Sequence, residues 1–366
     1  MDLCEQSPSY VRAIAPYQPG KPISELAREM GLKEKNIIKL ASNENPLGVS
    51  PRAKAAIKKA IAELGRYPDG NAFDLKAALA KRYKVPEECI VVGNGSNDLL
   101  EMAAAVFLAP GRSAVYSEHC FAVYPLATQS RGARSIVVPA KSYGHDLPAM
   151  LAAIAPDTRV VFVANPNNPT GTFVPGAELE DFVSRAPREV AVLVDEAYTE
   201  YLPRELRYDS IAWLKKYPNF ILTRTFSKVY GLAGLRVGFG LMQPALADLL
   251  NRVRQPFNVN SLALAAATAA LGDAKFVAKS TQMNRAGMAL LERAFKRLGL
   301  ETIPSCANFI TFRVRRAGEV YDRLLRQGVI VRPVAGYGMP EHLRVTIGTP
   351  KENRRFLKAL EAALDE

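Results

Sequence analysis

Short apolar runs alternate with helix-length stretches through the middle of the chain. Runs rich in β-branched residues occur at 90–92, 136–138, 160–163, 190–194, 220–223 and 237–241, and helical patterns lie between several of them, as at 97–108 and 176–186. Because these runs are apolar without alternation, both faces of each strand should be covered. The pattern predicts an α/β fold with a mostly parallel sheet flanked by helices, whose ligands bind at the carboxyl ends of strands.

The two ends of the chain follow other patterns. Residues 1–45 hold four prolines before Ser24 and one short helical stretch at 23–30, which predicts an irregular arm. Residues 245–300 look helical throughout, and short strand-like runs follow at 308–314, 329–334 and 343–348. These last runs predict a second, smaller α+β domain. We therefore expect an arm over 1–45 that packs with the small domain, a large domain over 46–260 and a small domain over 261–366.

Composition narrows the class of protein. The 366 residues are 48% hydrophobic and 23% charged, which is ordinary for a soluble globular protein. The formal net charge is +12, but Lys and Arg are spread along the chain without a long basic run. This distribution favours attraction of anionic small molecules over nucleic-acid binding.

Targeting and metal signals are weak. The start MDLCEQSPSY lacks a basic segment and an apolar run, and the longest apolar stretch, near Leu262 to Leu271, is too short to span a bilayer. The four cysteines form no CxxC, which favours reduced thiols. The three histidines show no metal-ligand spacing. We expect a cytoplasmic protein with neither a membrane segment nor a metal site.

Two candidate segments for ligand binding follow strands in the first half. GNGSNDLL (93–100) follows a strand and opens a helix, so its backbone N–H groups suit a phosphate, although Ser96 or Asn97 is also a plausible plain helix cap. NPNNPTG (165–171) follows the apolar run at 160–163, and an Asn amide there can donate to a phenolate oxygen. The alternative for this segment is a proline-rich turn that ends a strand.

Two further segments carry charged groups. LVDEAYTEY (193–201) places two carboxylates at the end of an apolar strand, where Asp195 is either a helix cap or a buried carboxylate that faces a cation. TRTFSKVYGLAGLRVG (223–238) places Lys228 between hydroxyl groups and an apolar run. A lone loop lysine is usually surface, but a desolvated lysine has a lowered pKa and becomes a nucleophile that can form a Schiff base.

Together these segments resemble the fold-type-I pyridoxal-phosphate (PLP) aminotransferases and, within them, the histidinol-phosphate aminotransferase family. The resemblance runs from YQPGK (17–21) and LASNENPLG (40–48) to LRVTIGT (343–349). It implies a large domain with a seven-stranded type of sheet, a smaller α+β domain and PLP as the cofactor. It also implies a homodimer with shared active sites.

The resemblance also implies roles for individual residues. Lys228 would form an imine with PLP and shuttle the substrate proton, and Asp195 would keep the pyridine nitrogen protonated so that the ring is an electron sink. Asn168 and Tyr198 would hydrogen-bond the phenolic oxygen of the ring. The phosphate would be held by Gly95, Ser96, Asn97, Thr225, Ser227 and Arg236, and by Tyr67 from the partner subunit. Phe121 would stack on the ring, unless it is simply a core residue.

Two arginines of the small domain bear on the substrate. In the family, residues equivalent to Arg332 and Arg344 hold the anionic end of the substrate, with a contribution from the residue at Tyr17; surface salt bridges are the alternative. The same arginines would serve the phosphate of L-histidinol phosphate in one half-reaction and a carboxylate of glutamate in the other. The resemblance thus implies transamination between L-histidinol phosphate and 2-oxoglutarate in histidine biosynthesis.

Other functions remain open at this point. Similar proteins include aromatic-amino-acid aminotransferases and a PLP decarboxylase that acts on threonine phosphate, because the motifs define the cofactor better than the substrate. A different class is an aminotransferase-like domain kept as a ligand-binding or regulatory module. Such a module should lack the lysine or carry an added DNA-binding segment, whereas Lys228 is present and no helix-turn-helix extension is visible.

Overall fold

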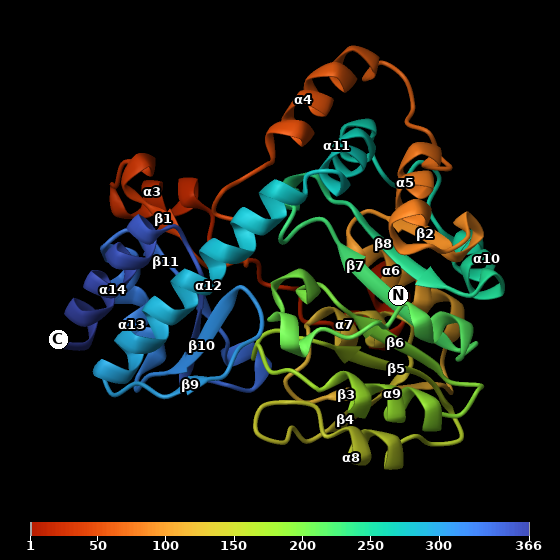
Figure 1. Ribbon diagram of the computed structural model, residues 1–366. Coiled ribbons are helices and arrows are strands. Elements are labelled where there is room, and N and C mark those ends of the chain that lie inside the picture. Colours follow the sequence, from red (N-terminus) through yellow and green to blue (C-terminus); the bar gives the residue numbers. More distant parts are fainter. Residues whose placement is uncertain (1, 366) are drawn as a thin grey trace.

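A computed structural model describes residues 2–365, and its largest feature is a seven-stranded sheet, here the large sheet (Figure 1). Its strand order is β2-β8-β7-β6-β5-β3-β4. The strands are β2 (Ile90–Gly93), β3 (Ser113–Ser117), β4 (Arg134–Val138), β5 (Thr158–Ala164), β6 (Ala191–Asp195), β7 (Phe220–Thr225) and β8 (Gly238–Met242). The neighbours from β7 to β4 are parallel, and β8 is antiparallel to both β2 and β7. This confirms the predicted mostly parallel sheet.

Helices cover both faces of the large sheet. They are α5 (Phe73–Tyr83), α6 (Ser96–Phe107), α7 (Val123–Ser130), α8 (Leu147–Ala152), α9 (Gly176–Arg185) and α10 (Pro244–Val253). Helices α4 (Pro51–Ala60) and α11 (Ser261–Leu271) pack on each other, and α11 also packs on α5. Along β5, Val160 and Phe162 belong to one hydrophobic cluster, whereas Val161 and Val163 belong to the cluster on the opposite face. All four side chains are fully buried, which explains why the strand reads as one uninterrupted apolar run.

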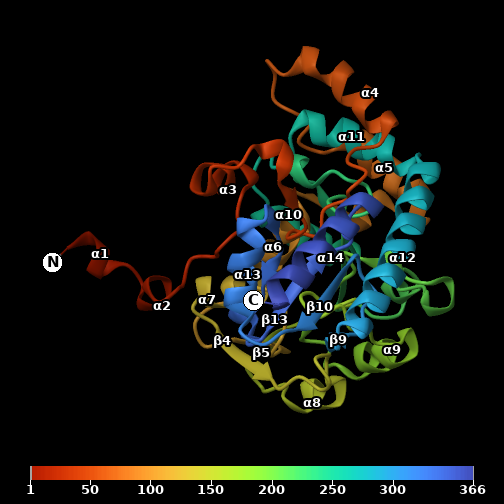
Figure 2. The ribbon, with the colours of Figure 1, turned by 90° about the vertical axis from the view of Figure 1, so that its left-hand side faces the viewer.

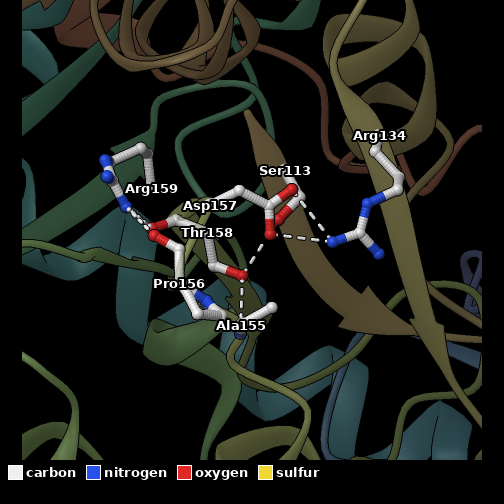
Figure 3. A network of polar contacts seen from close by, with 7 residues as sticks. All are labelled: Ser113, Arg134, Ala155, Pro156, Asp157, Thr158 and Arg159. Carbon is white, nitrogen blue, oxygen red and sulfur yellow. Dashed lines mark hydrogen bonds and ion pairs between the residues drawn. The ribbon is translucent and has the colours of Figure 1, made fainter. Parts of the chain in front are cut away.

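Strand β3, in the interior of the large sheet, was not predicted, because its ends are polar. Ser113 and Thr158 are both fully buried, and their hydroxyl groups are hydrogen-bonded to each other at 2.9 Å (Figure 3). The Ser113 N–H donates to the Asp157 carbonyl, and Arg134 forms an ion pair with the Asp157 carboxylate at 2.8 Å. This network joins the amino ends of β3, β4 and β5, so the polar residues that hide β3 in the sequence stabilise its place in the sheet.

A second sheet, here the small sheet, has four antiparallel strands in the order β12-β13-β10-β9. They are β9 (Thr302–Ile303), β10 (Phe309–Arg313), β12 (Arg332–Pro333) and β13 (His342–Thr346), and α12 (Ala274–Arg297), α13 (Ala317–Arg326) and α14 (Pro350–Asp365) accompany them. A separate core includes Phe295, Phe312 and Phe356. This is the predicted α+β unit, and α12 runs to it from α11 (Figure 1).

The N-terminal segment touches both sides of the molecule. Strand β1 (Ile38–Lys39) pairs in parallel with β11 (Val329–Ile330), and α3 (Ile23–Met30) buries Leu26 against the small-sheet side. Further back, α2 (Ser9–Arg12) lies beside α7, and α1 (Leu3–Gln6) projects beyond α2, away from the rest of the molecule (Figure 2). Because the arm contacts both sides, its contacts do not define a domain boundary. The division into an arm, a large domain and a small domain at residues 45 and 260 remains our proposal.

The expectation that residues 245–300 are helical throughout is wrong in detail. Helix α10 ends at Val253, and α11 and α12 each begin at a new cap, formed by the side chains of Asn260 and Asp273. These caps satisfy N–H groups that a continuous helix would bond internally, so the chain can turn between helices. Among residues 2–365, no single helix is long and apolar enough to cross a membrane; α11 and α12 meet those limits only as a pair, with a bend of 82° between them.

Candidate active site

A cavity of about 370 Å³ lies where β5, β6 and β7 end, between the large and small sheets. Most of the predicted site residues line it: Tyr17, Ser96, Asn97, Phe121, Asn168, Asp195, Tyr198, Thr225, Ser227, Lys228, Arg236, Arg332 and Arg344. Since the carboxyl ends of parallel strands meet at one edge, segments far apart in the sequence converge there. The site is thus placed where the strand pattern predicts it.

Lys228 follows β7 and lies in the wall of the cavity. Its Nζ donates to the carbonyl oxygen of Ser42 at 3.3 Å and lies 5.7 Å from the centre of the Tyr198 ring. Burial, with smaller contributions from Arg344 and Arg236, lowers the pKa of Lys228 from 10.5 to about 8. At neutral pH about a tenth of this amine is therefore neutral, which is the state that attacks an aldehyde.

The adjacent carboxylates of Asp195 and Glu196 point to opposite sides of β6. Asp195 lines the cavity and accepts a hydrogen bond from Thr223, whereas Glu196 faces away and accepts two from Arg224, at 2.6 and 3.0 Å. Asp195 is 4% exposed and forms no ion pair with any residue in the range 2–365. Burial raises the pKa of Asp195 to about 6. Such a carboxylate suits a cation that enters the cavity.

The asparagines of NPNNPTG have separate tasks. The Asn165 amide exchanges two hydrogen bonds with the backbone of Val174, and Asn167 donates to the His119 carbonyl oxygen at 2.7 Å. These two buried side chains brace the turn. Asn168 instead reaches the cavity, where its Oδ1 accepts a hydrogen bond from Arg344. With its oxygen occupied in this way, the Asn168 amide presents its N–H groups to a ligand.

An anion cradle is built around Arg236. Its Nη1 donates to the Ser227 hydroxyl at 3.4 Å, and Thr225 accepts from the Ser227 N–H at 3.1 Å. A Cβ at Gly95 would lie 2.6 Å from Nη2 of Arg236, so only glycine allows the guanidinium to approach the start of α6. No side chain caps α6, which overturns the alternative that Ser96 or Asn97 is a plain helix cap. The uncapped helix start and Arg236 together suit a phosphate.

Phe121 lines the cavity and also packs edge-on against the buried Tyr124, with 5.9 Å between ring centres. Tyr124 stacks on Phe162 of β5 at 4.7 Å. Phe121 thus lines the cavity and packs on a core residue, and its stacking on a cofactor ring stays a prediction.

The small-sheet side supplies two arginines with different surroundings. Arg344 of β13 is 5% exposed, and its Nη2 donates to the Ala41 carbonyl at 2.9 Å. Arg332 of β12 donates to the Gln18 carbonyl at 2.8 Å and lies over the Tyr17 ring at 5.6 Å. Neither arginine forms an ion pair within residues 2–365, which overturns the surface salt-bridge alternative.

Tyr67 does not line this cavity in its own chain. Its side chain is 83% exposed and stacks on the exposed Phe257, with 4.8 Å between ring centres. Ile61, Leu64 and Phe73 are also large, apolar and exposed. The contact of Tyr67 with the phosphate in the site of a partner subunit stays a prediction.

The cavity also contains residues to which the sequence assigned no role. Ser42, Asn43 and Tyr337 line it, and Asn43 donates to the Tyr198 hydroxyl at 2.9 Å. The signal was present, because Ser42 and Asn43 lie in the LASNENPLG segment that carries the family resemblance. That segment follows no strand of the large sheet, so the rule that ligands bind at the carboxyl ends of strands does not point to it.

The donor set fits PLP: an amine for its aldehyde, a buried carboxylate for its ring nitrogen, and a cradle for its phosphate, all around one cavity. The fold and this site together define a fold-type-I PLP-dependent enzyme.

Comparisons with known proteins give the family. Residues 35–360 match the family model for aminotransferases of class I and II. The chain is 60% identical over its whole length to histidinol-phosphate aminotransferase 2 of Nitrosospira multiformis, covering 93% of that protein. It is 62% identical to histidinol-phosphate aminotransferase 1 of Cupriavidus pinatubonensis, over 98% of this chain and 96% of that one. The chain belongs to the class I and II aminotransferases, in the histidinol-phosphate aminotransferase family.

A solved structure agrees with this assignment. The crystal structure of histidinol-phosphate aminotransferase from Sinorhizobium meliloti, in complex with pyridoxal-5'-phosphate, superposes with a TM-score of 0.90. It is 28% identical in sequence, and the match covers 98% of each chain. The sequence-based assignments of fold and family are confirmed.

Proposed function

We propose that this protein catalyses the PLP-dependent transamination of L-histidinol phosphate, with 2-oxoglutarate as amino acceptor, to give imidazole-acetol phosphate and glutamate. The observation that carries the proposal is the identity of about 60%, over the whole chain, with proteins named histidinol-phosphate aminotransferases. The geometry supports it, because one cavity combines a desolvated lysine with two arginines that form no ion pair in the described chain.

When bound, PLP supplies an electron sink for the electron pair left behind by the departing proton of the amino substrate. Lys228 moves that proton, since an amine with a pKa of about 8 can both accept and return it near neutral pH. Asp195 keeps a proton on the ring nitrogen of the bound cofactor. The protonated ring nitrogen is then the cationic partner that this buried carboxylate otherwise lacks.

The remaining contacts orient the cofactor. We assign the phenolic oxygen to the amide of Asn168 and the hydroxyl of Tyr198, both of which line the cavity. The phosphate contacts are assigned to Gly95, Ser96, Asn97, Thr225, Ser227 and Arg236, which surround the start of α6. Because the Arg236 guanidinium and the backbone N–H groups at the start of α6 are already in place, binding of the phosphate costs little conformational entropy.

The substrate is assigned to the small-sheet side. Arg344 is buried near Lys228 and suits a group close to the reacting carbon. Arg332 lies farther out, with Tyr17, and suits the phosphate end of L-histidinol phosphate. A dicarboxylate such as 2-oxoglutarate can use the same cations, which explains how one cavity serves both half-reactions.

We also propose a homodimer in which Tyr67 reaches the phosphate of the partner subunit. The support is the exposed apolar group of Ile61, Leu64, Tyr67, Phe73 and Phe257 on the large-sheet side. Tyr67 and Phe257 stack on each other, and exposed apolar and aromatic side chains are typical of subunit interfaces. A cytoplasmic location is proposed as well, supported by the four cysteines, which are all free thiols.

Steady-state kinetics with two amino donors tests the substrate assignment. L-histidinol phosphate and L-phenylalanine are each offered with 2-oxoglutarate to the PLP-loaded protein. The proposal expects kcat/KM for L-histidinol phosphate to exceed that for phenylalanine by about 100-fold, from ~3 kcal/mol of charge-assisted phosphate contacts. Negligible turnover of L-histidinol phosphate beside rapid turnover of phenylalanine would reject it in favour of an aromatic-amino-acid aminotransferase.

A further inference from the structure

Asn43 is a buried residue with an unusual backbone at the edge of the cavity. It is 1% exposed, and its φ of +56° lies in the left-handed region that few side chains other than Asn adopt. The conformation is fixed from two sides: the Asn43 N–H donates to the Thr346 hydroxyl at 2.9 Å, and Asn308 donates to the Asn43 carbonyl at 3.0 Å. Both partners belong to the small-sheet side.

The hydrogen bonds also define which way the Asn43 amide points. The Thr346 hydroxyl oxygen already accepts from the Asn43 N–H, so its own proton is free to go to Oδ1 of Asn43, 3.3 Å away. Nδ2 must then be the end that faces Tyr198, whose hydroxyl oxygen lies 2.9 Å from it. An amide nitrogen only donates, so the Tyr198 oxygen is the acceptor.

This arrangement leaves the Tyr198 proton for the cavity. Tyr198 is 2% exposed, and within residues 2–365 its hydroxyl donates to no other group. A phenol whose oxygen already accepts one bond keeps its proton for a different partner, and the cavity is the open side. Burial raises the pKa of Tyr198 to about 12, although Arg344 and Asn43 oppose this, so the phenol remains protonated and able to donate.

We propose that Asn43 is a positioning residue: by donating to the Tyr198 oxygen, it directs the Tyr198 proton to the phenolic oxygen of the bound cofactor. This inference rests on the proposed function, because it requires PLP in the cavity. It adds that Tyr198, on the large-sheet side, is aligned by a residue which the small-sheet side holds in place. The electronic state of the cofactor therefore depends on the contact between the two sides.

The test is a pH titration of the absorption spectrum of the PLP-loaded protein. A donor to the phenolic oxygen withdraws negative charge from it and so lowers the pKa of the Lys228-bound chromophore. Asn43→Gly removes the amide but retains the backbone, because glycine adopts positive φ without strain. The chromophore pKa is expected to rise by about half a unit to one unit. Thr346→Val, which removes the hydroxyl that accepts from the Asn43 N–H and orients the amide but leaves the amide in place, should give a smaller rise.

Tyr198→Phe separates alignment from a general structural effect. If Asn43 acts through Tyr198, Asn43→Gly should shift the chromophore pKa in the wild-type background and leave it unchanged in the Tyr198→Phe background. Asn45→Ala is the matched control. Asn45 is also buried in this segment, but its amide donates to Val229 and Ser280, so its loss should not move the chromophore pKa.

Two results would overturn the inference. One is an unshifted chromophore pKa in Asn43→Gly, and the other is an equal shift with and without the Tyr198 hydroxyl. A failure of the proposed function looks different: the wild-type protein would then show no chromophore that borohydride fixes on Lys228.

Discussion

The two sides of the cavity are built in different ways. On the large-sheet side, Asn168, Asp195 and Lys228 lie at or just after the ends of three neighbouring parallel strands, whose own residues are mostly buried. On the small-sheet side, Arg332 and Arg344 come from antiparallel strands and meet segments from the N-terminal arm, where Tyr17 is 51% exposed. One side is built on neighbouring strands of a single sheet, and the other is assembled from separate pieces whose outer part, at Tyr17, is open to solvent.

This difference matches two chemical tasks. The cofactor is common to both half-reactions and stays in place, so a rigid, buried frame suits it. The substrates enter and leave in each half-reaction, so their binding groups need access to solvent. Changes on the large-sheet side should therefore affect every substrate, whereas changes at the outer arginine should discriminate between substrates.

The largest effect is expected for Lys228→Ala. Loss of the amine that lines the cavity and is placed to move the substrate proton should lower kcat by at least about 10³-fold for every amino donor. Steady-state turnover of L-histidinol phosphate measures this, with circular dichroism to confirm that the variant is folded. Turnover within tenfold of wild type would remove Lys228 from the mechanism.

The next effect concerns the pH dependence of that amine. With a pKa of about 8 in place of 10.5, the neutral fraction of Lys228 at pH 7 is about 300-fold larger than for an ordinary lysine. Since the neutral amine is the reactive form, PLP incorporation into the apoprotein should speed up as the pH rises and level off above about 8. Borohydride trapping after short exposures gives the rate, and a rise that continues to pH 10 would contradict the lowered pKa.

The adjacent carboxylates Asp195 and Glu196 form a matched pair for the next prediction. Asp195→Asn removes the group assigned to the ring nitrogen and should lower kcat by about 10²-fold with little change in stability. Glu196→Gln instead leaves Arg224 buried without its anion, so it should cost about 3 kcal/mol of unfolding free energy. Urea unfolding and turnover, measured on both variants, should give opposite patterns. Equal loss of activity in the two would argue against a separate role for Asp195.

Arg332→Gln is the corresponding test on the small-sheet side. Removal of one charged hydrogen-bonding partner, worth ~2 kcal/mol, should raise KM for L-histidinol phosphate about 30-fold. L-histidinol without the phosphate serves as the control, since its kcat/KM should hardly change. A similar loss for both donors would place Arg332 away from the phosphate.

The smallest effect is expected at the proposed subunit contact. Tyr67→Phe removes one hydroxyl from the partner's phosphate site and should weaken PLP binding about fivefold, from ~1 kcal/mol for a single hydrogen bond. Equilibrium dialysis of PLP measures this change, and Tyr143→Phe, on a tyrosine that does not line the cavity, is the control. An unchanged PLP affinity in Tyr67→Phe would remove the proposed contact.

The large-sheet side was largely predictable from the sequence. Asn168, Asp195 and Lys228 each lie within a contiguous motif directly after an apolar run, and the parallel sheet brings those run ends together. Strand β3 was missed because Ser113 satisfies its buried hydroxyl through Thr158, a contact that local sequence does not contain.

The small-sheet side was predictable only through family resemblance. No local pattern places Tyr17 beside Arg332, because 314 residues separate them and their contact forms only in the folded chain. Asn43 shows the same limit: its role depends on Thr346 and Tyr198, which lie on different sides of the molecule. The breaks on either side of α11 likewise depend on capping by Asn260 and Asp273.

The most direct test of this account is to find where PLP attaches. The apoprotein is mixed with PLP, reduced with sodium borohydride, digested and analysed by mass spectrometry. The account predicts a single pyridoxyl adduct, on the nitrogen of Lys228. The adduct should be absent in Lys228→Ala, which lacks the amine, and should decrease in Asp195→Asn in proportion to the loss of PLP binding. An adduct on another lysine, or none at all, would contradict it.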